Sequence, residues 1–166
     1  MRIVLHDLGS SAFQALFPDL PDSVHVIGPA VDIRPCCGCF GCWIKTPGVC
    51  VINDAYQQMG ALFAQCSSLT LITRCCYGGY SPFVKNVMDR SISYLHPFFQ
   101  IRNGEMHHAR RYLNEFPLSV AFYGPVTPAE EETARRLVAA NALNLYCPSS
   151  IVCFCGKPEE MVGLLQ

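Results

Sequence analysis

The sequence predicts an α/β domain in which a doubly wound, parallel, five-stranded sheet carries helices on both faces. Short apolar runs alternate with helix-like segments along the chain, which is the pattern of a parallel sheet. At least two of these runs pass through a short loop directly into a helix start. The 166 residues, 51% of them hydrophobic, can bury one core, so we expect a single domain over residues 1–166.

Five segments have the length and apolar character of buried strands, and turn-forming Gly, Pro or Ser residues flank them. Helices are expected where a capping residue precedes a run of helix-forming residues. The expected strands are residues 2–8, 23–29, 67–73, 117–124 and 149–156. The expected helices are a brief one after Ser10 or Ser11, then 55–66 capped by Asp54, 82–95 starting at Pro82, and 128–143 capped by Thr127.

The carboxyl ends of the strands are the expected ligand site, because open parallel sheets bind ligands there. The loops that reach this edge are "GSS" after the first strand, "RCCYGGYS" after the third and "YGPVTP" after the fourth. A helix start offers free N–H groups and a positive dipole, which suit a phosphate. No acid–base pair or nucleophile triad is legible, so the catalytic residues stay unassigned.

Charge and hydropathy narrow the range of partners. The net charge is −1, from 12 basic and 13 acidic residues without a basic cluster, so we expect no nucleic acid partner. The apolar runs are far shorter than the roughly 20 residues of a membrane span, so we expect no membrane partner. The N-terminus lacks the pattern of a signal peptide, which favours the cytoplasm and reduced thiols.

Residues 36–50 hold five of the eleven cysteines, and their Gly and Pro residues are typical of a loop. Four of the cysteines have the spacing C-x2-C-x2-C-x7-C, namely Cys36, Cys39, Cys42 and Cys50. Such a set can ligate a [4Fe–4S] cluster, or zinc on thiolate count alone. Two other interpretations stay open: a reduced structural loop packed under Trp43, and a reversible disulfide such as Cys39–Cys42. We assign no residue as a metal ligand.

Several motifs in fixed order resemble the NADPH-dependent FMN reductase and iron–sulfur flavoprotein family. They are "PCCGCFGCWIKTPGVCVIND", "YGGYSPFVKNVMDRS" and "GEMHHARRY", within residues 34–126. The resemblance implies a flavodoxin-like fold, FMN as cofactor and NAD(P)H as electron donor. It implies an FMN-dependent oxidoreductase of the flavin or quinone reductase type that passes electrons to a small-molecule acceptor. One alternative is an electron-transfer flavoprotein with FMN and a [4Fe–4S] cluster.

The resemblance places the flavin site on the three loops at the carboxyl edge. The loop Cys75, Cys76, Tyr77, Gly78 and Gly79 is expected to contact the isoalloxazine ring, with glycine N–H groups on the ring and Tyr77 stacked on it. The residues expected at the phosphate and at the third side of the ring are Ser10, Ser11, Gly124 and Pro125. The plainer interpretation of each loop is an ordinary turn or a helix cap.

Two of these loops depart from the family pattern. The first is shortened to "GSSAFQALFP", and Arg74 and Cys76 replace the usual Pro and Tyr of the second. These departures favour a second alternative, a flavin-less binding module of the same fold. In the helix that follows, Lys85 and Asp89 are expected to form a structural ion pair.

An irregular insertion is expected at about residues 95–115. It is rich in aromatic residues, and long loops of this kind are usually functional or form interfaces. We expect it to pack against a second subunit in a homodimer or homotetramer and to help wall the flavin pocket.

Overall fold

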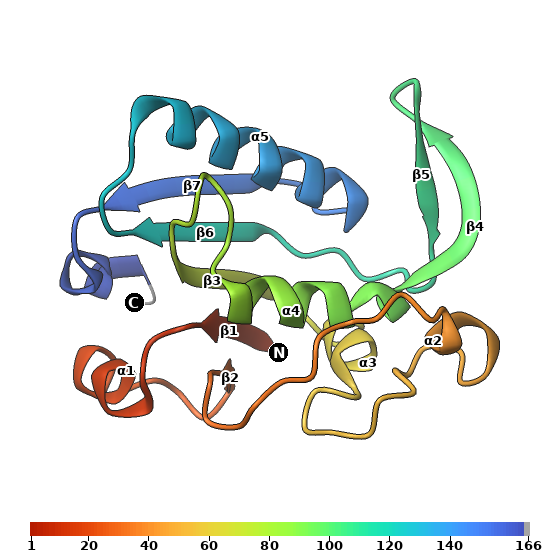
Figure 1. Ribbon diagram of the computed structural model, residues 1–166, viewed down its shortest axis with the longest axis horizontal. Helices are drawn as coiled ribbons and strands as arrows, with labels where there is room; N and C mark the ends of the chain where they lie inside the picture. The colour runs from red at the N-terminus through yellow and green to blue at the C-terminus, as the bar shows by residue number, and fades with distance from the viewer. Residues whose placement is uncertain (165–166) are drawn as a thin grey trace.

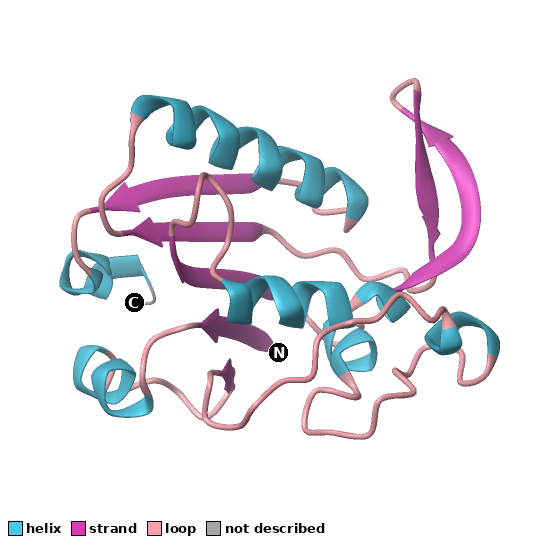
Figure 2. Cartoon of the chain, in the orientation of Figure 1, coloured by secondary structure: helices cyan, strands magenta, loops and turns pink. Residues whose placement is uncertain are grey.

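The computed structural model describes residues 1–164, in which a five-stranded sheet is layered between helices (Figures 1 and 2). All five strands are parallel, in the order β2-β1-β3-β6-β7. This order confirms the predicted fold class, because a doubly wound sheet of this kind reverses its direction of winding beside the first strand. The sheet strands are β1 Arg2–His6, β2 Val24–Ile27, β3 Ser68–Arg74, β6 Leu118–Tyr123 and β7 Ser150–Cys155.

Alternate residues of each strand supply two separate cores, one on each face of the sheet. Leu71 and Phe122 belong to the larger core, which α3, α4 and α5 cover. Ile72 and Ala121 belong to the smaller core, which α1 and the C-terminal 3₁₀ segment cover. The helices are α1 Ser10–Leu16, α2 Gly41–Ile44, α3 Met59–Phe63, α4 Pro82–Arg90 and α5 Pro128–Asn144, with 3₁₀ segments η1 Ile92–Tyr94 and η2 Pro158–Leu164.

Helix α5 forms as its capping signals predict. Thr127 and Glu130 make a reciprocal capping box, in which the Thr127 hydroxyl accepts from the Glu130 N–H and the Glu130 carboxylate accepts from the Thr127 N–H. Helix α4 begins at Pro82 as expected and ends at Arg90, where Ser91 passes the chain into η1.

Two expected caps are wrong. Gly9, not Ser10 or Ser11, is the N-cap of α1, and no side chain caps that helix. Asp54 caps no helix either, because α3 begins only at Met59. The Asp54 carboxylate instead accepts the N–H of Tyr56 and pairs with the buried Arg90, so a tertiary contact replaces the local cap.

The segment predicted as an irregular insertion forms a regular antiparallel hairpin. Its strands are β4 Leu95–Arg102 and β5 Glu105–Arg110, and they stand apart from the main sheet (Figure 1). Asn103 and Gly104 connect them with φ of 51° and 82°, which is the conformation of a two-residue hairpin turn. One face of the hairpin packs on the end of α5, where Arg102 lies over the ring of Tyr146.

Among residues 1–164, no helix is both long enough and apolar enough to span a membrane.

Candidate functional site

Two amides of the loop after β3 form hydrogen bonds within the loop itself. Tyr77 and Gly78 have φ of 53° and 76°, so the chain makes a tight turn between Cys76 and Gly79. The N–H of Cys76 donates to the carbonyl of Gly79 at 2.9 Å, and the N–H of Gly79 donates to the carbonyl of Cys76 at 2.8 Å. The Gly79 amide, which is expected from the sequence to meet a flavin ring, is therefore already bonded.

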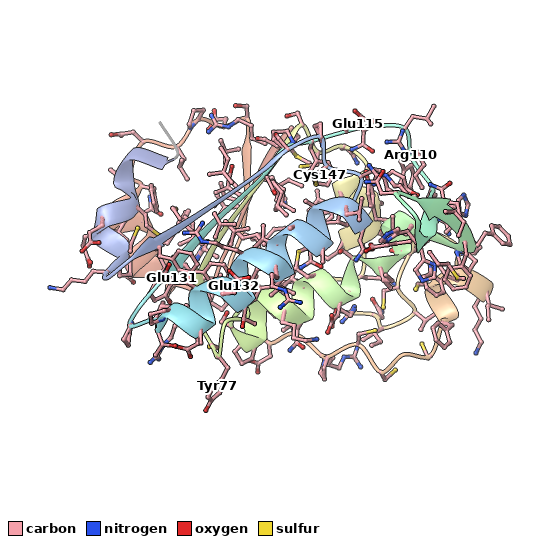
Figure 3. All side chains as sticks on the ribbon, turned by 90° about the horizontal axis from the view of Figure 1, so that it is seen from above. Tyr77, Arg110, Glu115, Glu131, Glu132 and Cys147 are labelled. Carbon is pink, nitrogen blue, oxygen red and sulfur yellow. The ribbon has the colours of Figure 1, made fainter. Side chains whose placement is uncertain are left out.

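The tip of this turn packs against α5 through Gly78. A Cβ atom at Gly78 would lie 2.7 Å from Cβ of Thr133 and 2.8 Å from the carbonyl oxygen of Glu130. Only glycine fits this contact. Packing against α5 therefore accounts for Gly78, and no bound ligand is needed to explain it. Tyr77 is 93% exposed and points into solvent, away from the helices (Figure 3).

Asp7 lies where the carboxyl ends of β1, β3 and β6 meet, a position that the sequence reasoning missed. Its carboxylate accepts the N–H of Arg74 at 2.8 Å, the hydroxyl of Thr73 at 3.2 Å and the phenol of Tyr123 at 2.8 Å. The signal in the sequence is an acid directly after the apolar run of the first strand. Burial, and then the hydrogen bond to Asp7, raise the pKa of Tyr123, so its phenol stays a donor at neutral pH.

We expect Asp7→Asn to lower the free energy of unfolding by about 1–3 kcal/mol, because hydrogen bonds to a charged acceptor are strong. The amide keeps one acceptor oxygen but loses the charge that three donors on two other strands share. Denaturant unfolding measures the change, and Asp19→Asn, at an exposed position, is the matched control. Equal stability of both variants would mean that Asp7 does not tie the strand ends together.

The other predicted site residues lie apart from one another. Ser10 and Ser11 are exposed at the start of α1, and Ser10 lines a cavity of about 490 Å³ that also contains His6 and Phe13. Gly124 has φ of 96°, and the Arg74 side chain lies 3.8 Å from where its Cβ would be. Pro125 is exposed beside it. The expected phosphate residues and ring residues are thus not gathered into one cavity.

A larger cavity of about 710 Å³ lies between α4, α5, the hairpin and the cysteine loop, residues 36–50. Cys76 and Gly79 of the β3–α4 turn form one wall, and Leu137 of α5 forms another. Trp43 of the cysteine loop also lines the cavity, and its indole N–H donates to the carbonyl of Leu95 at 2.9 Å. This bond anchors the loop to the start of the hairpin.

Aromatic contacts continue the wall from the cysteine loop to the hairpin. The ring of Trp43 stacks on Phe40 with 5.5 Å between centroids and lies 4.8 Å from the ring of His108. His108 in turn stacks on Phe99 at 4.7 Å. The cavity is therefore lined mostly by apolar and aromatic groups, as small-molecule sites usually are.

Two buried polar atoms on the cavity wall have no nitrogen or oxygen partner within residues 1–164, and the Arg90 guanidinium also lies beside the thiol of Cys50. They are Nε of Arg90 and Nδ1 of His108, and both residues line the cavity. The other guanidinium nitrogens of Arg90 are bonded to the Asp54 carboxylate and to the carbonyls of Arg34 and Ile52. An unsatisfied buried polar group is costly, so a ligand that supplies a partner would gain affinity here.

The five cysteines of the cysteine loop all line this cavity, together with Cys76. All eleven cysteines are free thiols. Within the described part of the chain, no three His, Cys, Asp or Glu side chains are close enough to hold a metal ion. The thiols line the cavity without forming a closed coordination shell within the described residues.

No family model and no curated protein sequence matches the chain. Solved structures do match it over nearly its whole length. Azoreductase AzrA is 9% identical with a TM-score of 0.56, and the alignment covers 97% of this chain and 89% of the azoreductase. An FMN-dependent NADH-azoreductase from Bacillus anthracis, solved in complex with FMN, is 8% identical with a TM-score of 0.54, covering 98% and 93%. An NADPH-quinone reductase from P. pentosaceus is 15% identical with a TM-score of 0.52, covering 99% and 94%.

The chain has a flavodoxin-like fold. Strand order, helix placement and these alignments agree on that point. At such low identities the structural likeness shows the fold alone. The function has to be argued from the residues of the site.

Proposed function

We propose that this chain is an FMN-dependent oxidoreductase that receives electrons from NAD(P)H and passes them to a small-molecule acceptor. The observation that carries the proposal is the cavity of about 710 Å³, which Cys76 and Gly79 of the predicted flavin loop border. The structural neighbours support it, since two of them are named as an FMN-dependent NADH-azoreductase and an NADPH-quinone reductase.

The residues of the cavity fit the flavin ring. Isoalloxazine is flat and apolar, with nitrogen and oxygen atoms along one edge, and the cavity offers apolar walls with a few polar atoms. Nε of Arg90 has no nitrogen or oxygen partner and lies beside only a thiol, a weak acceptor, so it is a donor that suits an acceptor on that edge; Nδ1 of His108 is a second polar atom. Trp43 and Leu137 line the cavity and would exclude water from the ring.

When bound, FMN supplies the hydride and electron chemistry, so the protein needs no nucleophile or acid–base pair of its own. The role of the protein is to orient the flavin ring and to exclude solvent from it. Arg90 is suited to the first task because Asp54 fixes its guanidinium with two bonds of 2.8 Å. The turn Cys76–Gly79 is held by its own two hydrogen bonds and is a rigid border.

We further propose that a second copy of the chain covers the outer face of the hairpin. Phe99, Ile101 and Met106 share this face and are 63%, 71% and 66% exposed. The face continues through His108 to the cavity mouth and to Phe40, which is 57% exposed. Contiguous apolar surface of this kind is rare on monomers, and a stable interface needs about 800 Å² on each partner.

A homodimer or homotetramer is therefore expected in sedimentation equilibrium at micromolar protein. Ile101→Glu together with Met106→Lys should shift the protein to the monomer, whereas Gln14→Glu, on the exposed side of α1, should leave the assembly intact. A wild-type monomer would contradict the proposed interface.

The second candidate function is a flavin-less binding module, and Asp7 favours it. Where the ends of β1, β3 and β6 meet, the Asp7 carboxylate already accepts hydrogen bonds from three donors. Its negative charge would repel a phosphate group at this position. The iron–sulfur alternative gains no such support, because no three ligands converge within residues 1–164.

Oxidation of NADH and NADPH by the purified protein, with and without added FMN, tests the proposal. A quinone and free flavin serve as trial acceptors. We expect turnover that depends on FMN and that boiled protein lacks. Saturating FMN that produces neither binding nor turnover would support the binding module instead.

A further inference from the structure

Cys37, Gly38 and Cys39 line the large cavity and belong to a segment without helix, strand or turn. Gly38 has φ of 64°, and a Cβ atom there would meet no other atom within 4 Å, so the left-handed backbone, not packing, favours glycine. Phe40 follows with φ of 55°. Within this segment the thiol of Cys37 lies within hydrogen-bond reach of the sulfur of Cys39.

The sulfur of Cys39 lies in contact with donors that favour its thiolate. The N–H of Gly41 is the main cause that lowers the pKa of Cys39, and the thiol of Cys37 and the charge of Lys45 add to it. Cys39 is also exposed, as is Cys37. Exposed thiols beside hydrogen-bond donors and a cation are the reactive kind.

The neighbouring thiols differ from Cys39. Burial, and then the thiols of Cys50 and Cys36, raise the pKa of Cys42. Cys153 and Cys155 also lie two residues apart with their sulfurs in contact, but they belong to strand β7, and burial raises the pKa of both. Spacing alone therefore does not make a reactive pair in this chain, and exposure to solvent distinguishes Cys37 and Cys39 from Cys153 and Cys155.

We propose that Cys37 and Cys39 form a thiol–disulfide exchange site for small-molecule disulfides that enter the cavity mouth. Both cysteines line the cavity, so a disulfide that binds there meets the Cys39 sulfur. Cys39 is the attacking residue, because it is exposed and its sulfur lies beside the N–H of Gly41 and the thiol of Cys37. Cys37 is the resolving residue.

The reaction balances with the disulfide as the oxidant. The Cys39 thiolate attacks one sulfur of the disulfide, the sulfur–sulfur bond breaks, and the first half leaves as a thiolate that takes up a proton. The Cys37 thiolate then attacks the sulfur of Cys39 in the mixed disulfide and releases the second half as a thiol. The protein loses two hydrogen atoms and gains a Cys37–Cys39 disulfide, and the small molecule is reduced to two thiols.

The exchange site does not depend on flavin, because no step needs a cofactor. Its test therefore uses protein that is free of FMN, and the exchange can fail while the proposed oxidoreductase function stands, or the reverse.

Fully reduced protein is mixed anaerobically with bis(2-hydroxyethyl) disulfide, and intact mass spectrometry follows the chain with time. The wild type is expected to lose the mass of two hydrogen atoms, and peptide mapping is expected to place the bond between Cys37 and Cys39. Cys39→Ser should slow this reaction by about tenfold or more, because the thiolate is the nucleophile. Cys37→Ser should stop it at a stable mixed disulfide on Cys39, seen as a gain of one half of the reagent.

Two matched controls come from the same chain. Cys36→Ser removes another exposed thiol of the cysteine loop. Cys153→Ser removes one member of the cysteine pair Cys153 and Cys155 on strand β7. Both are expected to react like the wild type. The inference is overturned if Cys39→Ser forms the internal disulfide as fast as the wild type, or if Cys37→Ser still loses two hydrogen atoms. Thermal melting of each variant shows that the fold is kept.

Discussion

Arg90→Met should lower the free energy of unfolding by about 3–5 kcal/mol, since it leaves a buried carboxylate without its partner. Arg90 is 1% exposed, and the Asp54 side chain is 10% exposed. The guanidinium donates to both carboxylate oxygens at 2.8 Å and to the carbonyls of Arg34 and Ile52 at 2.8 and 3.1 Å. One side chain thereby ties α4 to both ends of the cysteine-loop segment. Denaturant unfolding measures the loss.

Lys85→Met is the matched control on the same helix. The Lys85–Asp89 pair, which confirms the structural ion pair expected from the sequence, is exposed on both sides at 62% and 41%. Its loss should cost less than about 1 kcal/mol, because solvent screens exposed pairs. Asp54→Leu combined with Arg90→Met should recover part of the stability, because no charge is then left buried. Equal losses for Lys85→Met and Arg90→Met would contradict the account.

The ion pair between Asp54 and Arg90 also predicts that the protein loses stability in acid. Hydrogen bonds from Arg90 hold the pKa of Asp54 below its usual range. A carboxyl group whose pKa is lower in the folded state stabilises the fold above its unfolded pKa of about 3.9 and loses this effect as the pH falls through the folded value. Denaturant unfolding at a series of acidic pH values measures this profile, and Arg90→Met should flatten it.

Leu137→Trp should weaken FMN binding by at least about tenfold, because the larger ring takes up space that the flavin needs. Leu137 is half-buried on α5 and lines the cavity. The substitution adds bulk toward the cavity and leaves Arg90, Cys76 and Gly79 in place. Flavin fluorescence titration of the wild type and the variant gives the two dissociation constants.

Arg136→Trp, at the adjacent exposed position, adds the same ring outside the cavity. FMN affinity should stay within about twofold of the wild type, a difference of less than about 0.5 kcal/mol. Thermal melting of both variants checks that the helix is kept. If both variants bind FMN as the wild type does, the ring does not enter the cavity.

The strands of the sheet follow from the sequence because each carries a local signal. Continuous apolar runs predict strands buried on both faces, and Thr127 with Glu130 predicts the start of α5. The hairpin also carries a local signal, the pair Asn103-Gly104, although the length of the segment favours an irregular loop. A two-residue Asn-Gly turn predicts a hairpin more strongly than length predicts an irregular loop.

The site depends on contacts that no local pattern encodes. Asp54 and Arg90 are 36 residues apart, and Asp7 and Tyr123 are 116 residues apart. The local pattern around Asp54 predicts a helix cap, whereas the fold places this carboxylate against a buried cation. The composition of the cysteine loop marks it as unusual, but only the structure shows that all its thiols face one cavity.

The central claim is that the cavity beside the β3–α4 turn receives the ring of FMN, and equilibrium titration of the purified wild type with FMN tests it most directly. The account predicts saturable binding of one FMN per chain that survives desalting, and quenching of Trp43, the single tryptophan, as the cavity fills. Titration that never saturates, with Trp43 fluorescence unchanged, would contradict it and leave the flavin-less binding module as the function of this fold.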